Sequence, residues 1–388
     1  DVYKRQMYPR LKLLQKLLAN DGIIFISIDD TECSNLILIC NEIFGASNFV
    51  ANVSWQRTYS PRNDSKGIVS EVEHLVVFSK NPGWQPNKLP RTEAMDSRYK
   101  NPDNDVAPWK SSDAFAPGAA THQGMVYAIQ HPFTGEMLYP SNGRCWRYQQ
   151  SSMLEYMQGW CNYRLENLHD EKERARVCGI DESAVRKDVL AIVLEEPLEV
   201  SAAKAQKVYN RGRWPGFYFT KGGYGGIARK TYLENVGGRL PTNLWMYEET
   251  GHTDEAKKEL ISLFGGRSPF DTPKPTRLLD FVLKVAGTSE TLMLDSFAGS
   301  GTTAHAVLNA NKADNGNRHF ILIEMMDYAD SITAERVKRV IKGYGEGKNA
   351  VDGTGGNFSF YDLGEPLLMG DCLNEAVAPE KIREYIWF

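Results

Sequence analysis

The chain has 388 residues, 42% of them hydrophobic, so it is long enough to bury at least one full core and to form two or three domains. Its formal net charge is -4, so any binding of nucleic acid has to come from a local basic surface rather than from the field of the whole molecule. No apolar run approaches the roughly 20 residues of a membrane span and no signal peptide is recognisable, so we expect a protein of the reducing cytoplasm without membrane contact.

The first residues are expected to lie outside the fold. Residues 1–6 can be back-translated into DNA that resembles the end of a sequencing adapter, and we interpret them as an artefact. The natural protein is then expected to begin upstream of Met7. At the other end, residues 385–388 are bulky and apolar, which hints at a second truncation.

Residues 7–80 show an α/β pattern. Leucines at helical spacing predict a helix over 8–20, and Gly22 follows as a helix stop. Segment 23–28 is apolar on both faces, which is typical of a parallel strand covered by helices on both sides. The remaining elements of this region are a helix and two strands, predicted at 32–44, 49–55 and 74–79.

Residues 81–241 have a different character, with many Pro, Gly, Trp and Tyr residues and few long apolar periods, and we expect an inserted domain. Its segment 201–241 holds eight basic residues against one acidic residue, interleaved with aromatic side chains. This pattern predicts a surface that binds DNA phosphates and bases. The alternative is a solvated basic face over an aromatic mini-core. The candidate DNA-binding residues are Arg211, Arg213, Lys221, Arg229 and Lys230.

The α/β pattern resumes over 242–345, and a C-terminal extension, 346–388, follows. The predicted helices of this region are 254–264, 277–285, 302–311 and 333–341. The predicted strands are 291–294 and 319–323.

A glycine loop follows the first of these strands. Asp295 ends the strand, Gly299 and Gly301 lie in the loop and a helix follows, which is the nucleoside-binding turn of a doubly wound sheet. At the tip of the next strand, Glu324 can accept hydrogen bonds from both ribose hydroxyls. A phosphate-binding P-loop is excluded because the loop lacks the necessary lysine. S-adenosylmethionine, which has a positive sulfonium and no phosphate, suits the acid Asp295 and the hydroxyls of the loop better.

Two longer motifs make the pattern specific. The run Asp295-x-Phe297-x-Gly299-Ser300-Gly301-Thr302-Thr303, preceded by Phe270-Asp271-Thr272-Pro273-Lys274-Pro275-Thr276, resembles the cofactor half of the beta-class DNA amino-methyltransferases. The segment from Met7 to Asp30 resembles the modification subunit of type III restriction-modification systems, and the similarity extends to about Ile341. The loop and the resemblance together assign a cofactor site to Lys274, Pro275, Thr276, Asp295, Phe297, Gly299, Ser300, Gly301, Thr302, Thr303 and Glu324.

The resemblance implies a fold and an activity. The fold is α/β, a doubly wound Rossmann-like methyltransferase sheet in permuted order: a catalytic half, an inserted target-recognition domain and a cofactor half. The activity is methyl transfer from S-adenosylmethionine to adenine N6 of double-stranded DNA after the base is rotated out of the helix. The implied partners are a restriction subunit and a second copy of the chain. The alternatives are a cytosine-N4 methyltransferase and a non-catalytic DNA-binding module with a vestigial pocket.

The family's catalytic loop is missing from this sequence. Members use an Asp-Pro-Pro-Tyr loop to hold the amine of the target base, and no Asp-Pro-Pro-Tyr or Ser-Pro-Pro-Tyr run occurs here. The resemblance places that loop just before Met7, together with a central strand between the strands of Ile23 and Leu292. We therefore assign no catalytic residue and expect the chain to be inactive on its own.

Other polar residues are expected to be structural. Asp29 and Asp30 either border the active site or cap the next helix. The six cysteines form no C-x-x-C pair and have no histidine at zinc-ligand spacing, so we predict no metal site. The histidines have no partner at catalytic spacing and receive no role: His74, His122, His131, His169, His252, His305 and His319.

Overall fold

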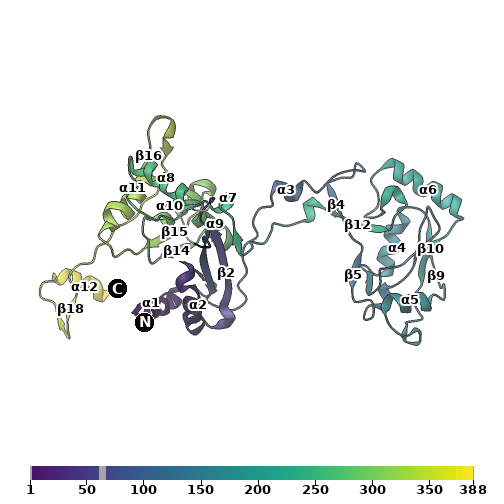
Figure 1. Ribbon diagram of the computed structural model, residues 1–388, viewed down its shortest axis with the longest axis horizontal. Helices are drawn as coiled ribbons and strands as arrows, with labels where there is room; N and C mark the ends of the chain where they lie inside the picture. The colour runs from purple at the N-terminus through teal and green to yellow at the C-terminus, as the bar shows by residue number, and fades with distance from the viewer. Residues whose placement is uncertain (1, 61–66, 388) are drawn as a thin grey trace. The chain divides into compact units, whose positions relative to one another are not determined.

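The computed structural model describes residues 2–60 and 67–387. The chain divides into two compact units, of which unit 1 combines Asp1–Leu89 with Leu240–Phe388 and unit 2 is Pro90–Arg239. In Figure 1 the purple and the green-to-yellow parts of the chain form unit 1, and the blue-to-teal middle part forms unit 2. Two segments far apart in the sequence therefore build one unit.

The first sheet of unit 1 has the strand order β1-β3-β2-β13. Its strands are β1 (Ile23–Ile28), β2 (Phe49–Gln56), β3 (Val72–Ser79) and β13 (Leu244–Trp245). Side chains alternate along β3, so that Val76 and Phe78 point to one face and Leu75 and Val77 to the other. The first pair packs with helices α1 (Val2–Leu17) and α2 (Asp30–Phe44), and the second with α9 (Thr276–Ala286). Apolar helices thus cover both faces.

Two details of this region answer the sequence predictions. The prediction that strand 23–28 pairs in parallel is wrong for the one neighbour that the described residues give it. This strand, β1, pairs antiparallel with β3 from Ile23 to Ile28. Asp29 is the N-cap of α2, and its carboxylate accepts a hydrogen bond from the Thr31 amide at 3.1 Å. Capping therefore accounts for Asp29.

The second part of unit 1 carries the glycine loop. Strands β14 (Leu292–Asp295) and β15 (His319–Leu322) are parallel and form a sheet of their own. The helices around them are α8 (Thr253–Phe264), α10 (Thr302–Asp314) and α11 (Glu335–Lys342), whereas α7 (Tyr247–Thr250) packs with α9 and β2. A π-helical segment, η6 (Ala329–Ala334), leads directly into α11. The predicted mixed α/β architecture is confirmed, but the described strands of unit 1 form separate sheets rather than one.

Unit 2 contains many short strands around an aromatic core. Its sheets have the orders β7-β6-β10-β9, β11-β12-β4 and β5-β8. The strands are β4 (Trp109–Asp113), β5 (Phe115–Pro117), β6 (Ile129–Gln130), β7 (Met137–Leu138), β8 (Arg144–Trp146), β9 (Tyr163–Glu166), β10 (Ala191–Leu194), β11 (Phe217–Phe219) and β12 (Ile227–Tyr232). The helices are α3 (Glu93–Asp96), α4 (Gln150–Gln158), α5 (Glu171–Cys178) and α6 (Leu198–Arg211).

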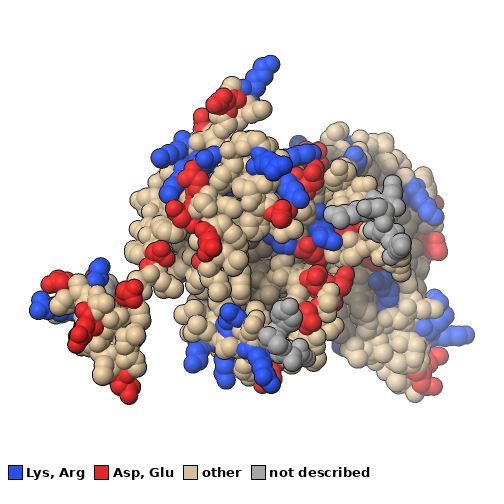
Figure 2. Space-filling model, turned by 60° about the vertical axis from the view of Figure 1, so that its left-hand side comes forward, with Lys and Arg blue, Asp and Glu red and all other residues tan. Residues whose placement is uncertain are grey.

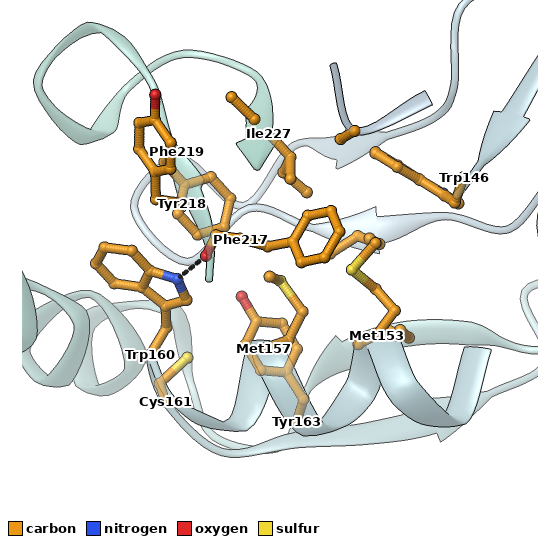
Figure 3. Close-up of a cluster of buried hydrophobic side chains, with 14 of the residues drawn as sticks. Trp146, Met153, Met157, Trp160, Cys161, Tyr163, Phe217, Tyr218, Phe219 and Ile227 are labelled. Carbon is orange, nitrogen blue, oxygen red and sulfur yellow. Dashed lines mark hydrogen bonds between the residues drawn. The ribbon is translucent and has the colours of Figure 1, made fainter. Parts of the chain in front are cut away.

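The core of unit 2 takes up aromatic residues from the basic segment. Figure 3 shows Phe217 of β11 beside Met153 and Met157 of α4, with the Trp160 indole donating to the Phe217 carbonyl at 2.9 Å. The ring of Phe219 lies 5.4 Å from that of Trp160. These rings are almost completely buried. They stabilise the unit by removing apolar area from water, and they cannot stack on bases from this position.

The chain ends in small elements. They are β16 (Gly343–Tyr344), β17 (Val351–Asp352), β18 (Leu368–Met369), β19 (Cys372–Leu373) and α12 (Pro379–Trp387). None of the helices in the described ranges combines the length and the hydropathy that a bilayer crossing requires.

Candidate functional site

The glycine loop adopts a backbone that favours glycine at two positions. Gly299 has φ +52° and Gly301 has φ +78°, both in the left-handed region. A Cβ added to Gly299 would lie 3.3 Å from the Phe270 ring, and one added to Gly301 would lie 3.0 Å from the Thr333 carbonyl oxygen. The missing side chains therefore leave room for the protein's own Phe270 and Thr333, in addition to relieving backbone strain.

Two carboxylates flank this loop at the ends of adjacent strands. Asp295 lies opposite Leu322 in the parallel register. Glu324 follows Leu322 by two residues. The Asp295 carboxylate accepts hydrogen bonds from the Thr303 hydroxyl at 2.6 Å and from the Phe297 amide at 3.1 Å. The structure thus brings together both acids that the sequence assigned to the cofactor site.

The Glu324 carboxylate is already hydrogen-bonded to the backbone. It accepts the Gly299 amide at 2.9 Å and the Met325 and Met326 amides at 3.0 Å each. A carboxylate offers about four acceptor sites, and the Tyr328 side chain also interacts with Glu324, so at most one site remains. Accepting both ribose hydroxyls, as the sequence suggested, would require Glu324 to share or release at least one of these amides.

Exposed apolar side chains accompany these acids. Phe297 is 57% exposed, and Ile323 and Met326 are each about half exposed. Exposed apolar side chains beside carboxylates suit a nucleoside, because the base has apolar faces and the sugar carries hydroxyls. The residues present therefore fit S-adenosylmethionine.

The other predicted cofactor residues lie further inside. Lys274 forms an ion pair with Glu73, and its ammonium lies 5.0 Å from the centre of the Trp55 ring. Its carbonyl accepts the Thr302 hydroxyl at 3.2 Å, which joins segment 274–276 to the loop. Buried in the same region are Pro275, Thr276, Ser300, Thr302 and Thr303.

Arg336 is a residue that the sequence analysis missed. Its side chain is fully buried, and one guanidinium nitrogen donates to the hydroxyls of Ser300 at 3.0 Å and Thr302 at 2.9 Å. The other nitrogen donates to Glu259 at 2.8 Å and contacts His305 at 3.1 Å. One feature of the sequence could have indicated its burial. Arg336 follows the buried Thr333 by three residues and precedes the buried Val340 by four, so it is a charged residue on the buried face of the helix.

Two histidines have partners that their sequence positions did not indicate. His305 lies 3.7 Å from Glu259, but burial and the nearby Arg336 lower the His305 pKa to about 3, so the ring is neutral. His74 contacts Asp30 at 2.7 Å, and Asp30 also accepts from Ser70 at 3.0 Å. The hydrogen bond to His74 is the main cause that lowers the Asp30 pKa.

The candidate DNA-binding residues of unit 2 fall into two groups. Arg211, Arg213 and Lys221 are exposed, and Arg229 is partly buried. Lys230 is different. Its ammonium is fully buried and binds Asp103 at 2.5 Å as well as Asp105, so it is not available to DNA phosphates. The hypothesis of DNA contact through Lys230 is therefore corrected, because burial and ion pairing use this charge inside the fold.

Charges of both signs are mixed on the surface. On the face shown in Figure 2, Lys and Arg side chains alternate with Asp and Glu side chains. In the described ranges, His, Cys, Asp and Glu form no group of three or more that could hold a metal ion.

A family profile matches most of the chain. The profile of the N6/N4 methyltransferases, described as DNA methylase, covers residues 1–335. The StyLTI Mod subunit, a type III restriction-modification enzyme of Salmonella typhimurium strain LT2, is 31% identical over 351 residues, which are 86% of this chain and 44% of that protein.

Two further relatives show the range of similarity. The EcoPI Mod subunit, a type III restriction-modification enzyme of Escherichia phage P1, is 27% identical over 82% of this chain and 44% of its own length. The type II methyltransferase M.KpnI of Klebsiella pneumoniae is 27% identical over 82% of this chain and 66% of its own length. The chain thus spans less than half the length of the two Mod subunits.

Proposed function

Because the chain belongs to the N6/N4 DNA methylase family, we propose that unit 1 binds S-adenosylmethionine and that the whole protein methylates DNA. One observation carries the cofactor proposal: Asp295 ends β14, Glu324 lies two residues beyond the end of the adjacent parallel strand β15, and the left-handed loop lies beside both acids. The cofactor supplies the methyl group. The two carboxylates would balance its positive sulfonium and orient its ribose, while Phe297 and its apolar neighbours would contact the base.

A calorimetric titration of the chain with S-adenosylmethionine tests this proposal. We expect wild type to bind and Asp295→Ala to lose binding, because the variant removes a carboxylate and the partner of Thr303. Asp352→Ala is the matched control, since Asp352 is an exposed acid of the same unit. Absence of binding by wild type, or equal binding by Asp295→Ala, would overturn the proposal.

The family resemblance also supports adenine N6 as the methyl acceptor in a restriction-modification system. Mass spectrometry of DNA treated with the full-length protein would separate N6-methyladenine from N4-methylcytosine, the product of the alternative enzyme. If the completed chain binds DNA but no cofactor, the non-catalytic module is the better interpretation.

We propose that the chain as given does not transfer methyl groups by itself. It contains no Asp-Pro-Pro-Tyr loop to hold the target amine. The resemblance implies a further strand between β14 and β1, and each of these is an edge strand in the described sheets. Transfer of tritiated methyl to DNA by the purified chain would contradict this proposal.

We propose unit 2 as the target-recognition domain, inserted between the two halves of a permuted methyltransferase domain. Its exposed Arg211, Arg213 and Lys221 support binding of double-stranded DNA, with the partly buried Arg229 as a further candidate. The relatives named Mod subunits of restriction-modification enzymes support a restriction subunit as a partner. A second copy of the protein is proposed from the family resemblance alone. Light scattering and co-purification of the full-length protein test these two partners.

A further inference from the structure

The buried guanidinium of Arg336 joins its own helix, α11, to three other segments: α8, the start of α9 and the glycine loop. Its partners are Glu259 of α8, Thr276 at the start of α9, and Ser300 and Thr302 of the loop. Thr302 in turn donates to the Lys274 carbonyl. A movement of Arg336 would therefore affect both stretches of sequence assigned to the cofactor site.

Within the described ranges, the positive charge of Arg336 is buried beside a single acid, so its contacts with hydroxyl groups matter for its stability. Glu259 is its one acidic hydrogen-bond partner among the described residues, and the Glu259 side chain is 24% exposed. The nearby His305 is neutral and contributes no charge, and its Nδ1 atom acts as an acceptor toward the guanidinium. The hydroxyls of Ser300 and Thr302 consequently supply solvation that the buried cation has lost, and a buried charge without such partners is costly.

The same contacts turn the loop hydroxyls away from any ligand. Ser300 is 3% exposed and Thr302 is 6% exposed, so their oxygens face the guanidinium. The ligand side of the loop is left with backbone groups and the two carboxylates. The sequence had assigned these hydroxyls to the cofactor, whereas their geometry serves the shape of the loop.

We propose that Arg336 is a positioning residue that holds the glycine loop in its ligand-binding shape through the hydroxyls of Ser300 and Thr302. This inference rests on the proposed binding of S-adenosylmethionine by the same loop. Arg336 itself does not touch the ligand in this arrangement, because it lies behind the loop and is completely buried.

A mutant cycle separates this role from general stabilisation. We expect Arg336→Met to weaken binding of S-adenosylmethionine by about tenfold in calorimetry, since a hydrogen bond to a charged group is lost at each hydroxyl. The double variant Ser300→Ala/Thr302→Val should weaken binding similarly. In that background, adding Arg336→Met should cost less than about threefold more, because the connection is already broken. Full additivity of the two changes would overturn the proposal.

Hydrogen exchange tests the same idea without a ligand. Amides of residues 299–303 should exchange about tenfold faster in Arg336→Met, while the matched control Arg318→Met leaves them unchanged. Arg318 is a suitable control because it is 11% exposed and ion-paired with Asp314 at 2.7 Å in the same unit. Unchanged loop exchange in Arg336→Met would overturn the proposal.

The two readouts can fail separately. If wild type binds no S-adenosylmethionine, the proposed function fails, whereas loop exchange still decides the role of Arg336. If Arg336→Met does not fold, Arg336→Lys and the double hydroxyl variant replace it. Arg336→Lys keeps the positive charge but lacks the planar guanidinium that donates to several partners at once. This variant should therefore fold and still show faster hydrogen exchange in the loop.

Discussion

Each unit of the molecule buries a cation completely, but the two cations have different partners. Lys230 of unit 2 binds two acids, Asp103 and Asp105, and lies 5.0 Å over the Trp109 ring. Arg336 of unit 1 binds one acid, and its other partners include hydroxyls of a loop. A buried charge that is neutralised by acids stabilises the fold, whereas one that depends on loop hydroxyls also fixes the shape of the loop.

The largest expected effect concerns the acids around Lys230. Lys230→Met leaves Asp103 fully buried without its cation, which should destabilise unit 2 by about 3–5 kcal/mol. Hydrogen exchange of β12 under increasing urea measures this loss. The exposed Lys221→Met is the control and should change stability by less than about 0.5 kcal/mol. A similarly small effect of Lys230→Met would remove the contrast between the two cations.

A smaller effect is expected at the front of the glycine loop. Glu324→Gln replaces an acceptor of three backbone amides by a carboxamide with one acceptor oxygen. Affinity for S-adenosylmethionine should fall by about tenfold, or about 1.4 kcal/mol, in calorimetry. Glu346→Gln, at an exposed acid of unit 1, should have no effect. Equal affinity of wild type and Glu324→Gln would mean that Glu324 does not order the ligand side of the loop.

The pH dependence of unit 1 gives a third test. Burial raises the pKa of Asp280 on α9 to about 6, and the nearby Glu259 adds to this shift. The folded state then holds the proton more tightly than the unfolded state, so the contribution to stability is present below about pH 4 and is lost as the pH rises to about 6. Asp280→Asn should therefore stabilise unit 1 by about 1 kcal/mol at pH 7.5, allowing for partial exposure, and hardly at pH 4.

Urea unfolding at both pH values measures this difference, with Asp352→Asn as the exposed control. An equal effect of Asp280→Asn at pH 4 and pH 7.5 would show that Asp280 does not titrate in this range.

The smallest effects are expected on the surface of unit 2. Arg211→Ala, Arg213→Ala and Lys221→Ala should each reduce the dependence of log affinity on log salt by about one in DNA titrations of the full-length protein. The reason is that each lost phosphate contact releases about one counterion fewer. An unchanged salt slope in all three variants would leave unit 2 without its proposed basic DNA contacts.

Much of the fold could be predicted because local patterns determine it. Segment 23–28 was predicted as a strand with the bounds it has in the structure, and Gly22 and Asp29 marked its ends. The direction of that strand could not be predicted, since its partner β3 lies about 50 residues further along the chain. Pairing between distant segments leaves no periodic signal.

The candidate site was predictable where a motif is continuous in sequence and not where partners are distant. The motif assigned the loop and Glu324 to one site, and the structure places Glu324 within hydrogen-bonding distance of the loop. Lys221 and Lys230, in contrast, are two lysines of the same basic segment that the sequence pattern did not tell apart. Only the distant Asp103 and Asp105 distinguish buried Lys230 from exposed Lys221. The sequence analysis did not identify Arg336 for the same reason, because its partner Glu259 lies 77 residues earlier in the chain.

The π-helical segment η6 determines which side of the following helix, α11, faces the glycine loop. Thr333 of this segment donates to the Gly299 carbonyl at 2.6 Å, and Arg336 is three residues later in α11. Successive residues of an α-helix are about 100° apart around the axis, so deletion of one residue from η6 would turn Arg336 away from Ser300 by about that angle. The wider turn thus acts as a spacer that aligns two contacts with one loop.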